Sequence, residues 1–176
     1  VRLDSLAILP AMNFSMALST FVGQNIGAGK AERVKSGLKS TLLMSSVVSL
    51  SVTSIVVFFG KYLIQLFVRS SESEVIMIGN EYLVIVGSFY IVFSAMFVLN
   101  GVLRGAGDTL IPMFFTFFSL WMVRIPVSYF LSERIGESGI WWAVPISWIT
   151  GTVLAYLYYR TGKWKTKAVV KHPSDL

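Results

Sequence analysis

The chain of 176 residues contains no cysteine, a single histidine and few charged residues. Without cysteine, disulfides, thiolate metal ligands and cysteine nucleophiles are excluded. His172 lies among polar residues near the C-terminus, so neither a metal site nor another resident cofactor is expected. Charged residues make up 14% of the chain, against about 25% in an ordinary soluble domain. This shortage argues against a soluble globular protein.

Hydrophobic residues, in contrast, make up 55% of the chain. A transmembrane helix needs about 20 apolar residues, and neutral stretches of this length recur between charged residues. The pattern predicts an all-α polytopic bundle of about five spans. The predicted spans are residues 5–22, 40–60, 82–103, 109–132 and 138–159. They form one transmembrane bundle over residues 1–160, followed by a basic tail over residues 161–176.

The connections between these spans are short, at residues 23–39, 61–81, 104–108 and 133–137. The second of them has room for a surface helix that starts at Ser73. The first span contains Pro10 and Asn13, so it is expected to be truncated or kinked. Because the chain begins with Val1 and no signal-peptide pattern precedes the first apolar stretch, we expect it to be a fragment.

Lysine and arginine are distributed unevenly over the two sides of this bundle. One side carries Lys30, Arg33, Lys35, Lys39, Arg104, Arg160, Lys163, Lys165, Lys167 and Lys171, and the other carries Arg2, Lys61, Arg69 and Arg134. Because cytoplasmic loops carry the excess of basic residues, we expect an integral protein of the plasma (inner) membrane with a cytoplasmic C-terminus. The basic tail then favours contact with anionic lipid over nucleic acid, which is not an expected partner.

Two of the connections on the basic side contain the pattern G-x-x-x-G-A-G followed by a charged residue. The residues concerned are Gly23, Gly27 and Gly29 in the first copy, and Gly101, Arg104, Gly105, Gly107 and Asp108 in the second. Glycines at such positions end helices or let backbones approach closely, and they also suit a hinge or gating loop. Both interpretations stay open. Arg104 and Asp108 are four residues apart and are close enough to pair if the segment is helical.

Arg124 interrupts the fourth predicted span. An arginine inside a membrane costs about 3 kcal/mol or more unless it is solvated or paired, so it needs a partner. Pro126 frees backbone carbonyls that would provide one. Structural anchoring and a role in a transport pathway are both consistent with this position.

Side chains of one kind recur at helical spacing on several spans. Ser45, Ser49 and Thr53 form a stripe of small hydroxyls that favours close helix packing over substrate contact. Phe89, Phe93 and Phe97 form an aromatic stripe, which predicts either a lipid-facing surface or the wall of a cavity for flat, lipophilic, often cationic molecules. Trp141, Trp142 and Trp164 are expected to be anchors in the membrane interface.

No catalytic constellation is recognisable at membrane depth. The only candidate carboxylates at this depth would be Asp4 and Glu81, and both lie near span ends. The sequence shows no Ser/His/Asp set, no pair of carboxylates and no set of metal ligands. An enzyme is therefore not expected.

Four strings in order carry a resemblance to a known family: PAMNFSMALSTFVGQNIGAGKAERVKSG, LNGVLRGAGDTLIPM, WMVRIPVSYFL and GIWWAVPISWITGTVLAYLYYRTGKWK. Together they resemble the second half of the multidrug and toxic compound extrusion (MATE) transporters. The resemblance implies a fold of twelve helices in two bundles, to which this chain contributes most of the eighth to the twelfth helix. It also implies export of drugs or organic cations in exchange for sodium or protons.

One departure from the family concerns the coupling ion. Several members have an acidic residue about eight residues before the G-V-L-R-G string, where this chain has Phe93, Ser94 and Ala95. The resemblance therefore implies that the coupling ion is bound mainly by the missing N-terminal lobe, which would be a partner of this chain.

The transport hypothesis places substrate in a cavity between the two bundles. The candidate substrate contacts are Phe89, Phe93, Arg124 and Tyr129. Two alternatives remain, a flippase of lipid-linked oligosaccharides from the same superfamily and a membrane scaffold that does not transport. A flippase predicts a cavity with many basic residues, whereas Arg124 is the only one expected within a span.

Overall fold

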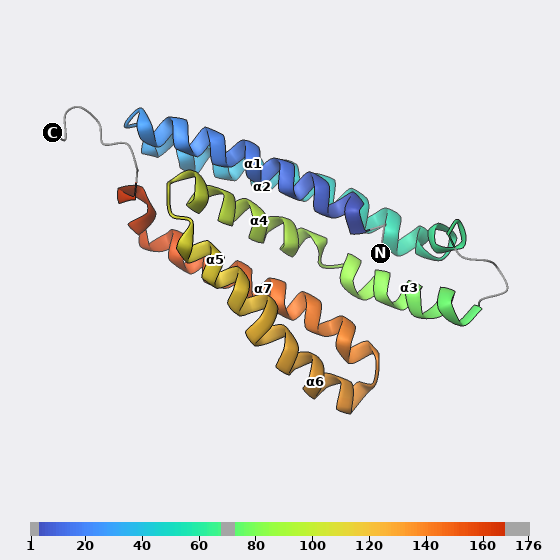
Figure 1. The fold of residues 1–176 in the computed structure, drawn as a ribbon. Helices are drawn as coiled ribbons and strands as arrows, with labels where there is room; N and C mark the ends of the chain where they lie inside the picture. The colour runs from blue at the N-terminus through green and yellow to red at the C-terminus, as the bar shows by residue number, and fades with distance from the viewer. Residues whose placement is uncertain (1–3, 68–72, 168–176) are drawn as a thin grey trace.

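The computed structural model describes residues 4–67 and 73–167, and within these ranges the chain is helical apart from short turns (Figure 1). The helices are α1 (Ser5–Gly27), α2 (Ala31–Gln65), α3 (Ser73–Gly87), α4 (Tyr90–Gly105), α5 (Leu110–Phe117), α6 (Arg124–Ile135) and α7 (Ser138–Thr161). A π-helical segment, η2 (Phe118–Val123), joins α5 to α6, and a 3-10 turn, η3 (Lys163–Thr166), follows α7. The predicted all-α class is confirmed. Arg2, Arg69, Lys171, His172 and the rest of the tail beyond residue 167 lie outside the described residues.

Four helical stretches are long and apolar enough to cross a membrane: α1, α2, Leu110–Ile135 and α7. A fifth forms if α3 and α4 make one span, although a bend of 47° separates them. The continuous helix expected over residues 82–103 is therefore wrong, because the chain turns at Ser88 and Phe89. Thr53 of α2 donates a hydrogen bond of 2.7 Å to the Gly87 carbonyl at this break. Ser45 and Ser49 of the same stripe are buried, in agreement with helix packing.

The connections are shorter than the charges in the sequence suggested. Helix α2 begins at Ala31 rather than near Ser40, since Val34 and Leu38 are buried one turn apart and extend the helical periodicity through the charged segment. Helix α3 begins at Ser73 as expected, but it packs on α2 and α7 instead of lying alone on the surface.

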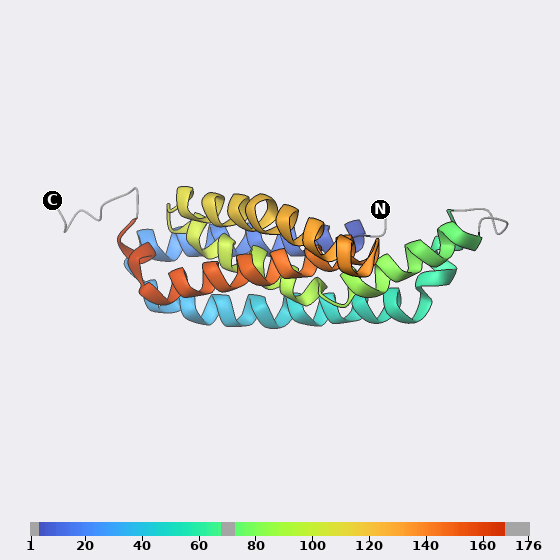
Figure 2. The same ribbon diagram turned by 90° about the horizontal axis from the view of Figure 1, so that it is seen from below.

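Helix α4 lies at the centre of the bundle, where α1, α2 and α7 contact it (Figure 1). The stretch α5–η2–α6 runs along the outside of α7, on the side away from α2 (Figure 2). Two apolar clusters fill the interior. One surrounds Tyr90, Phe93 and Trp148, and the other surrounds Leu103 and Trp164.

Trp164 is an interior residue. It is 2% exposed, its indole donates to the Tyr159 carbonyl at 2.9 Å, and its ring stacks on Tyr159. Trp141 is also partly buried, against the ring of Tyr82, whereas Trp142 is exposed. The expectation of interface anchors is therefore wrong for Trp164, because η3 folds back onto the bundle.

Candidate functional site

A groove runs along the stretch α5–η2–α6. It consists of two hollows that meet at Leu120 and Trp121, and the π-helical segment lies at this junction. The first hollow, of about 390 Å³, lies between α4 and α5, and the second, of about 690 Å³, lies against α6. Both combine aromatic and polar side chains. We refer to the two hollows together as the α5–α6 groove.

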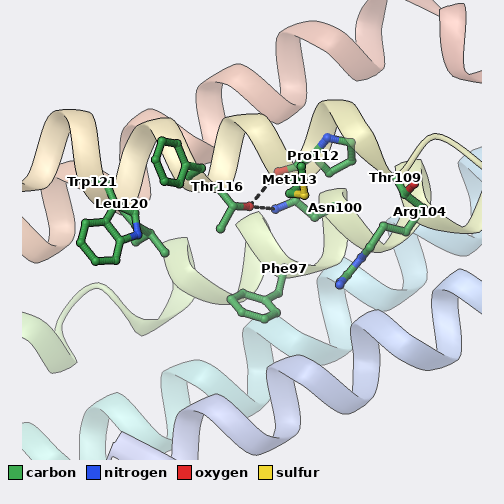
Figure 3. A pocket seen from close by; sticks show the side chains of 10 residues that line it. Phe97, Asn100, Arg104, Thr109, Pro112, Met113, Thr116, Leu120 and Trp121 are labelled. Atoms are coloured by element: carbon green, nitrogen blue, oxygen red, sulfur yellow. Dashed lines mark hydrogen bonds between the residues drawn. The ribbon is translucent and has the colours of Figure 1, made fainter.

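The first hollow contains a buried amide (Figure 3). The Nδ2 atom of Asn100 donates to the Thr116 hydroxyl at 3.4 Å, and this hydroxyl donates to the Pro112 carbonyl at 2.8 Å. Asn100 is 7% exposed, and its Oδ1 atom has no hydrogen-bond partner among the described residues. A polar contact thus holds α4 and α5 together where few other contacts do.

Arg104 lines the same hollow and reaches toward α1 (Figure 3). Its guanidinium donates to the Ser15 hydroxyl at 3.0 Å, and that hydroxyl donates to the Phe97 carbonyl at 2.7 Å. Asp108 is buried and accepts a hydrogen bond of 2.5 Å from Tyr158. The expected pair between Arg104 and Asp108 is therefore replaced by contacts to α1 and α7, because the helix ends at Gly105, before Asp108.

Arg124 lines the second hollow at the junction of η2 and α6. It lies eleven residues before the end of α6 at Ile135, about 16 Å along a helix. Its side chain is exposed and makes no hydrogen bond or ion pair with the described residues, so the expected contact with carbonyls freed by Pro126 is not formed. The partner that an intramembrane arginine requires is not supplied by this part of the chain.

The structure separates the four candidate substrate contacts into two pairs. Arg124 and Tyr129 both line the second hollow, and Tyr129 is 68% exposed. Phe93 instead packs in the core, with its ring 4.9 Å from that of Trp148, and Phe89 packs edge-on against Trp142. Neither phenylalanine lines the groove, because both rings pack against tryptophans of α7. Substrate contact at these residues stays a prediction.

The two glycine patterns form the same helix ending. In each, the third glycine has positive φ, 69° at Gly29 and 89° at Gly107. The amides at the last three positions donate to equivalent carbonyls in both copies, for example Lys30 to Asn25 and Asp108 to Leu103. This is the glycine-ended helix cap that the pattern predicts.

The remaining glycines of the patterns lie within α1 and α4: Gly23, Gly27, Gly101 and Gly105. The expectation that they are loop residues is therefore wrong. A Cβ atom on Gly101 would lie 2.6 Å from the Ser15 carbonyl oxygen, and one on Gly105 would lie 2.3 Å from that of Ser19. These two glycines therefore let α1 and α4 cross at close range. A hinge or gating role for the patterns stays a prediction.

The sequence did not indicate one further candidate residue. Asp4, at the start of α1, is buried and accepts hydrogen bonds from Tyr82 at 3.0 Å and from Tyr90 at 2.7 Å. Tyr82 belongs to α3 and Tyr90 to α4, so Asp4 contacts both sides of the break. Nothing in the sequence links Asp4 to Tyr82 and Tyr90, which lie far from it in the chain. From the sequence, Asp4 was only a carboxylate near the end of a span.

Comparisons with known proteins identify the family of the chain. The MatE family model matches residues 1–130. The chain belongs to the MatE family. A relative from Bacillus subtilis, the probable multidrug resistance protein YpnP, is 38% identical over 93% of this chain and 36% of its own length. Another from Thermotoga maritima, the probable multidrug resistance protein NorM, is 31% identical over 97% of this chain and 37% of its own length.

This MatE chain thus spans little more than a third of the length of these curated relatives. It is an integral membrane protein, and many of its large apolar side chains face outward from the bundle. These side chains are frequent on α2, α5 and α6, for example Phe58, Phe114 and Phe130.

Proposed function

We propose that this chain is the C-terminal lobe of a transporter that exports drugs or organic cations by sodium- or proton-coupled antiport. The observation that carries the proposal is membership of the MatE family, together with four apolar helical stretches, or five if α3 and α4 form one span, and an open groove along α5–η2–α6. The names of the relatives, which refer to multidrug resistance, support the substrate class.

The missing N-terminal lobe would complete the transport path and bind most of the coupling ion. No carboxylate is among the described residues that line the α5–α6 groove, which supports an ion site elsewhere. Substrate would bind between the lobes, in contact with Arg124 and Tyr129. In the alternating-access scheme the tight α1–α4 crossing would move as a unit, and the α3/α4 break would supply a point of flexure.

The distribution of charge supports a cytoplasmic C-terminus in the plasma (inner) membrane. The turns after α1, α4 and α7 lie at one end of the bundle (Figure 2), with Lys30, Arg104, Arg160, Lys163 and Lys165. Glu74, Glu133 and Glu137 lie at the opposite end. Basic residues on the cytoplasmic side are typical of membrane proteins.

The test of this function is efflux of a fluorescent lipophilic cation from cells that produce the full-length protein. We expect these cells to accumulate less dye than cells without the protein. Accumulation should recover when the sodium gradient, the proton gradient or both are dissipated. Dye accumulation equal to that of cells without the protein, under every gradient, would contradict the proposal and leave a non-transporting scaffold as the explanation.

A further inference from the structure

A separate groove lies between α1 and α2, at the end of the bundle that carries most of the lysine and arginine. The two helices run side by side along one side of the bundle (Figure 1), and the groove between them measures about 750 Å³. Neither α5 nor α6 is among the described elements that line it. We refer to it as the α1–α2 groove. We propose that it binds phosphatidylethanolamine, a membrane phospholipid, with the phosphate of the headgroup at Arg33 and the ammonium at Glu32.

The charged residues that line this groove are one acid and one base. Glu32 and Arg33 are consecutive in the first turn of α2, and neither makes a side-chain hydrogen bond or an ion pair with the described residues. The neighbouring lysines are exposed and do not line the groove: Lys30, Lys35 and Lys39. A headgroup with one phosphate and one ammonium complements this pair of opposite charges, whereas a purely anionic headgroup would be repelled by Glu32.

Three hydroxyl groups continue the polar part of the groove. Ser36, Ser40 and Thr41 line it and make no hydrogen bond with the described residues, although helical serine and threonine often bond to a carbonyl of the preceding turn. Ser36 lies three residues after Arg33, so the two side chains share one face of α2 and reach the same phosphate. The hydroxyls of Ser40 and Thr41, one turn further, suit the ester carbonyls of the lipid glycerol.

Beyond the hydroxyls the groove becomes apolar toward the middle of the bundle. Met44 of α2, which is 58% exposed, and Phe14 of α1 line this part. Helix α2 has 35 residues and is thus about 52 Å long, so its ends extend past a hydrocarbon core of about 30 Å. Met44 lies about 16 Å along the helix from Arg33. The groove therefore passes from headgroup depth into the hydrocarbon, as one phospholipid does.

The carboxylate of Glu32 distinguishes between headgroups that share a phosphate. A primary ammonium carries three N–H donors and donates to a carboxylate, whereas the trimethylated ammonium of phosphatidylcholine has none. Phosphatidylglycerol offers no cation at all. We therefore expect the α1–α2 groove to bind phosphatidylethanolamine more tightly than either of the other two lipids.

The test measures lipid binding to the purified full-length protein in detergent by native mass spectrometry. The three lipids, with identical acyl chains, are added separately, and the apparent Kd of the first bound lipid is determined for each. We expect phosphatidylethanolamine to bind about threefold or more tighter than phosphatidylcholine. Glu32→Gln should reduce this preference to less than about 1.5-fold. Arg33→Gln should weaken binding of all three lipids about threefold or more, because each contains a phosphate.

Lys35→Gln and Glu74→Gln are the matched controls. Lys35 is exposed on α2 beside the groove, and Glu74 is exposed in the first turn of α3, as Glu32 is in the first turn of α2. Neither control residue lines the α1–α2 groove, so both variants should leave the three affinities unchanged. The unfolding temperature of each variant is recorded, and Glu32→Ala replaces Glu32→Gln if the latter does not fold.

A preference for phosphatidylethanolamine that survives Glu32→Gln would overturn the inference. So would tightest binding of phosphatidylglycerol, because the groove would then recognise negative charge alone, as basic residues at a membrane surface do. Lipid binding that neither variant alters would also overturn it and would leave the N-terminal lobe as what covers the groove. The result does not depend on transport, so a protein that binds phosphatidylethanolamine through Glu32 and Arg33 but exports no dye loses only the proposed function.

Discussion

Equivalent glycines in the two copies of the pattern have different surroundings. Gly27 and Gly105 hold the same position in their copies, and both are helical. A Cβ atom on Gly27 would meet nothing within 4 Å, whereas one on Gly105 would overlap backbone atoms of Ser19. Backbone atoms cannot rotate away, so one glycine tolerates a methyl group and the other does not.

We therefore expect Gly105→Ala to lower the free energy of unfolding by about 1–3 kcal/mol, because α1 and α4 must separate to admit the methyl group. Gly27→Ala should be neutral or should stabilise by up to about 1 kcal/mol, because alanine favours the helix. Thermal unfolding of the purified full-length protein in detergent measures both. Similar values for the two variants would contradict the tight crossing seen in the structure.

Among the elements, the broken helix α3–α4 shows how an interrupted span is held. The turn at Ser88 and Phe89 interrupts the regular backbone hydrogen bonding of one continuous helix, and Thr53 supplies a donor to the Gly87 carbonyl there. Asp4 then accepts one hydroxyl from each half of the break. The bend is thus fixed by polar contacts from α1 and α2, which are helices distant in the sequence from α4.

Replacement of Asp4 by Asn tests this connection. An amide keeps one acceptor oxygen but turns a donor toward the second tyrosine, so one buried hydroxyl loses its acceptor. We expect the free energy of unfolding to fall by about 1–3 kcal/mol. Tyr90→Phe should have a loss of similar sign, and Tyr62→Phe, on the exposed face of α2, should have none. An Asp4→Asn protein as stable as the original would show that these contacts do not hold the bend.

Across the whole molecule, charged residues are distributed unevenly between the two ends of the long axis. The turns that follow α1, α4 and α7 carry lysine and arginine, and the opposite turns carry mainly glutamate. Helices α1, α2 and α7 each run most of the length of the bundle (Figure 1). The shorter helices share two spans, α3 with α4 and α5 with α6. The fold thus concentrates lysine and arginine at one end of the bundle, whereas Lys61 and Arg134 are the basic residues beside the glutamates at the described part of the opposite end.

Single cysteines test the orientation that follows from this polarity. We expect a membrane-impermeant maleimide to label Glu137→Cys in intact cells, and to label Lys163→Cys only after permeabilisation, because basic ends stay in the cytoplasm. This part of the protein contributes no cysteine of its own to the background. Labelling of Lys163→Cys in intact cells would reverse the proposed orientation.

Much of the architecture follows from local chemistry and was predictable. Apolar runs of about 20 residues predict helices wherever the chain meets lipid, since a backbone in hydrocarbon must satisfy its own hydrogen bonds. The glycine patterns likewise predict caps, since Gly29 and Gly107 adopt positive φ that other residues resist. Lys39 failed as the boundary of the span predicted over residues 40–60, because Val34 and Leu38 continue the periodicity of α2 beyond it, whereas Glu137 correctly marked the start of α7.

The groove and the side-chain contacts around it depend on which helices pack together. The periodicity of the sequence within one helix does not give this information. Phe93 and Tyr129 are both aromatic residues on apolar helices, yet one packs in the core and the other lines the groove, because α4 is surrounded and α6 lies at the edge. Asp4 meets Tyr82 and Tyr90 across more than seventy residues. Arg124 was recognisable from its charge within an apolar run, whereas its lack of a hydrogen bond or ion pair with the described residues emerged only once the helices were packed.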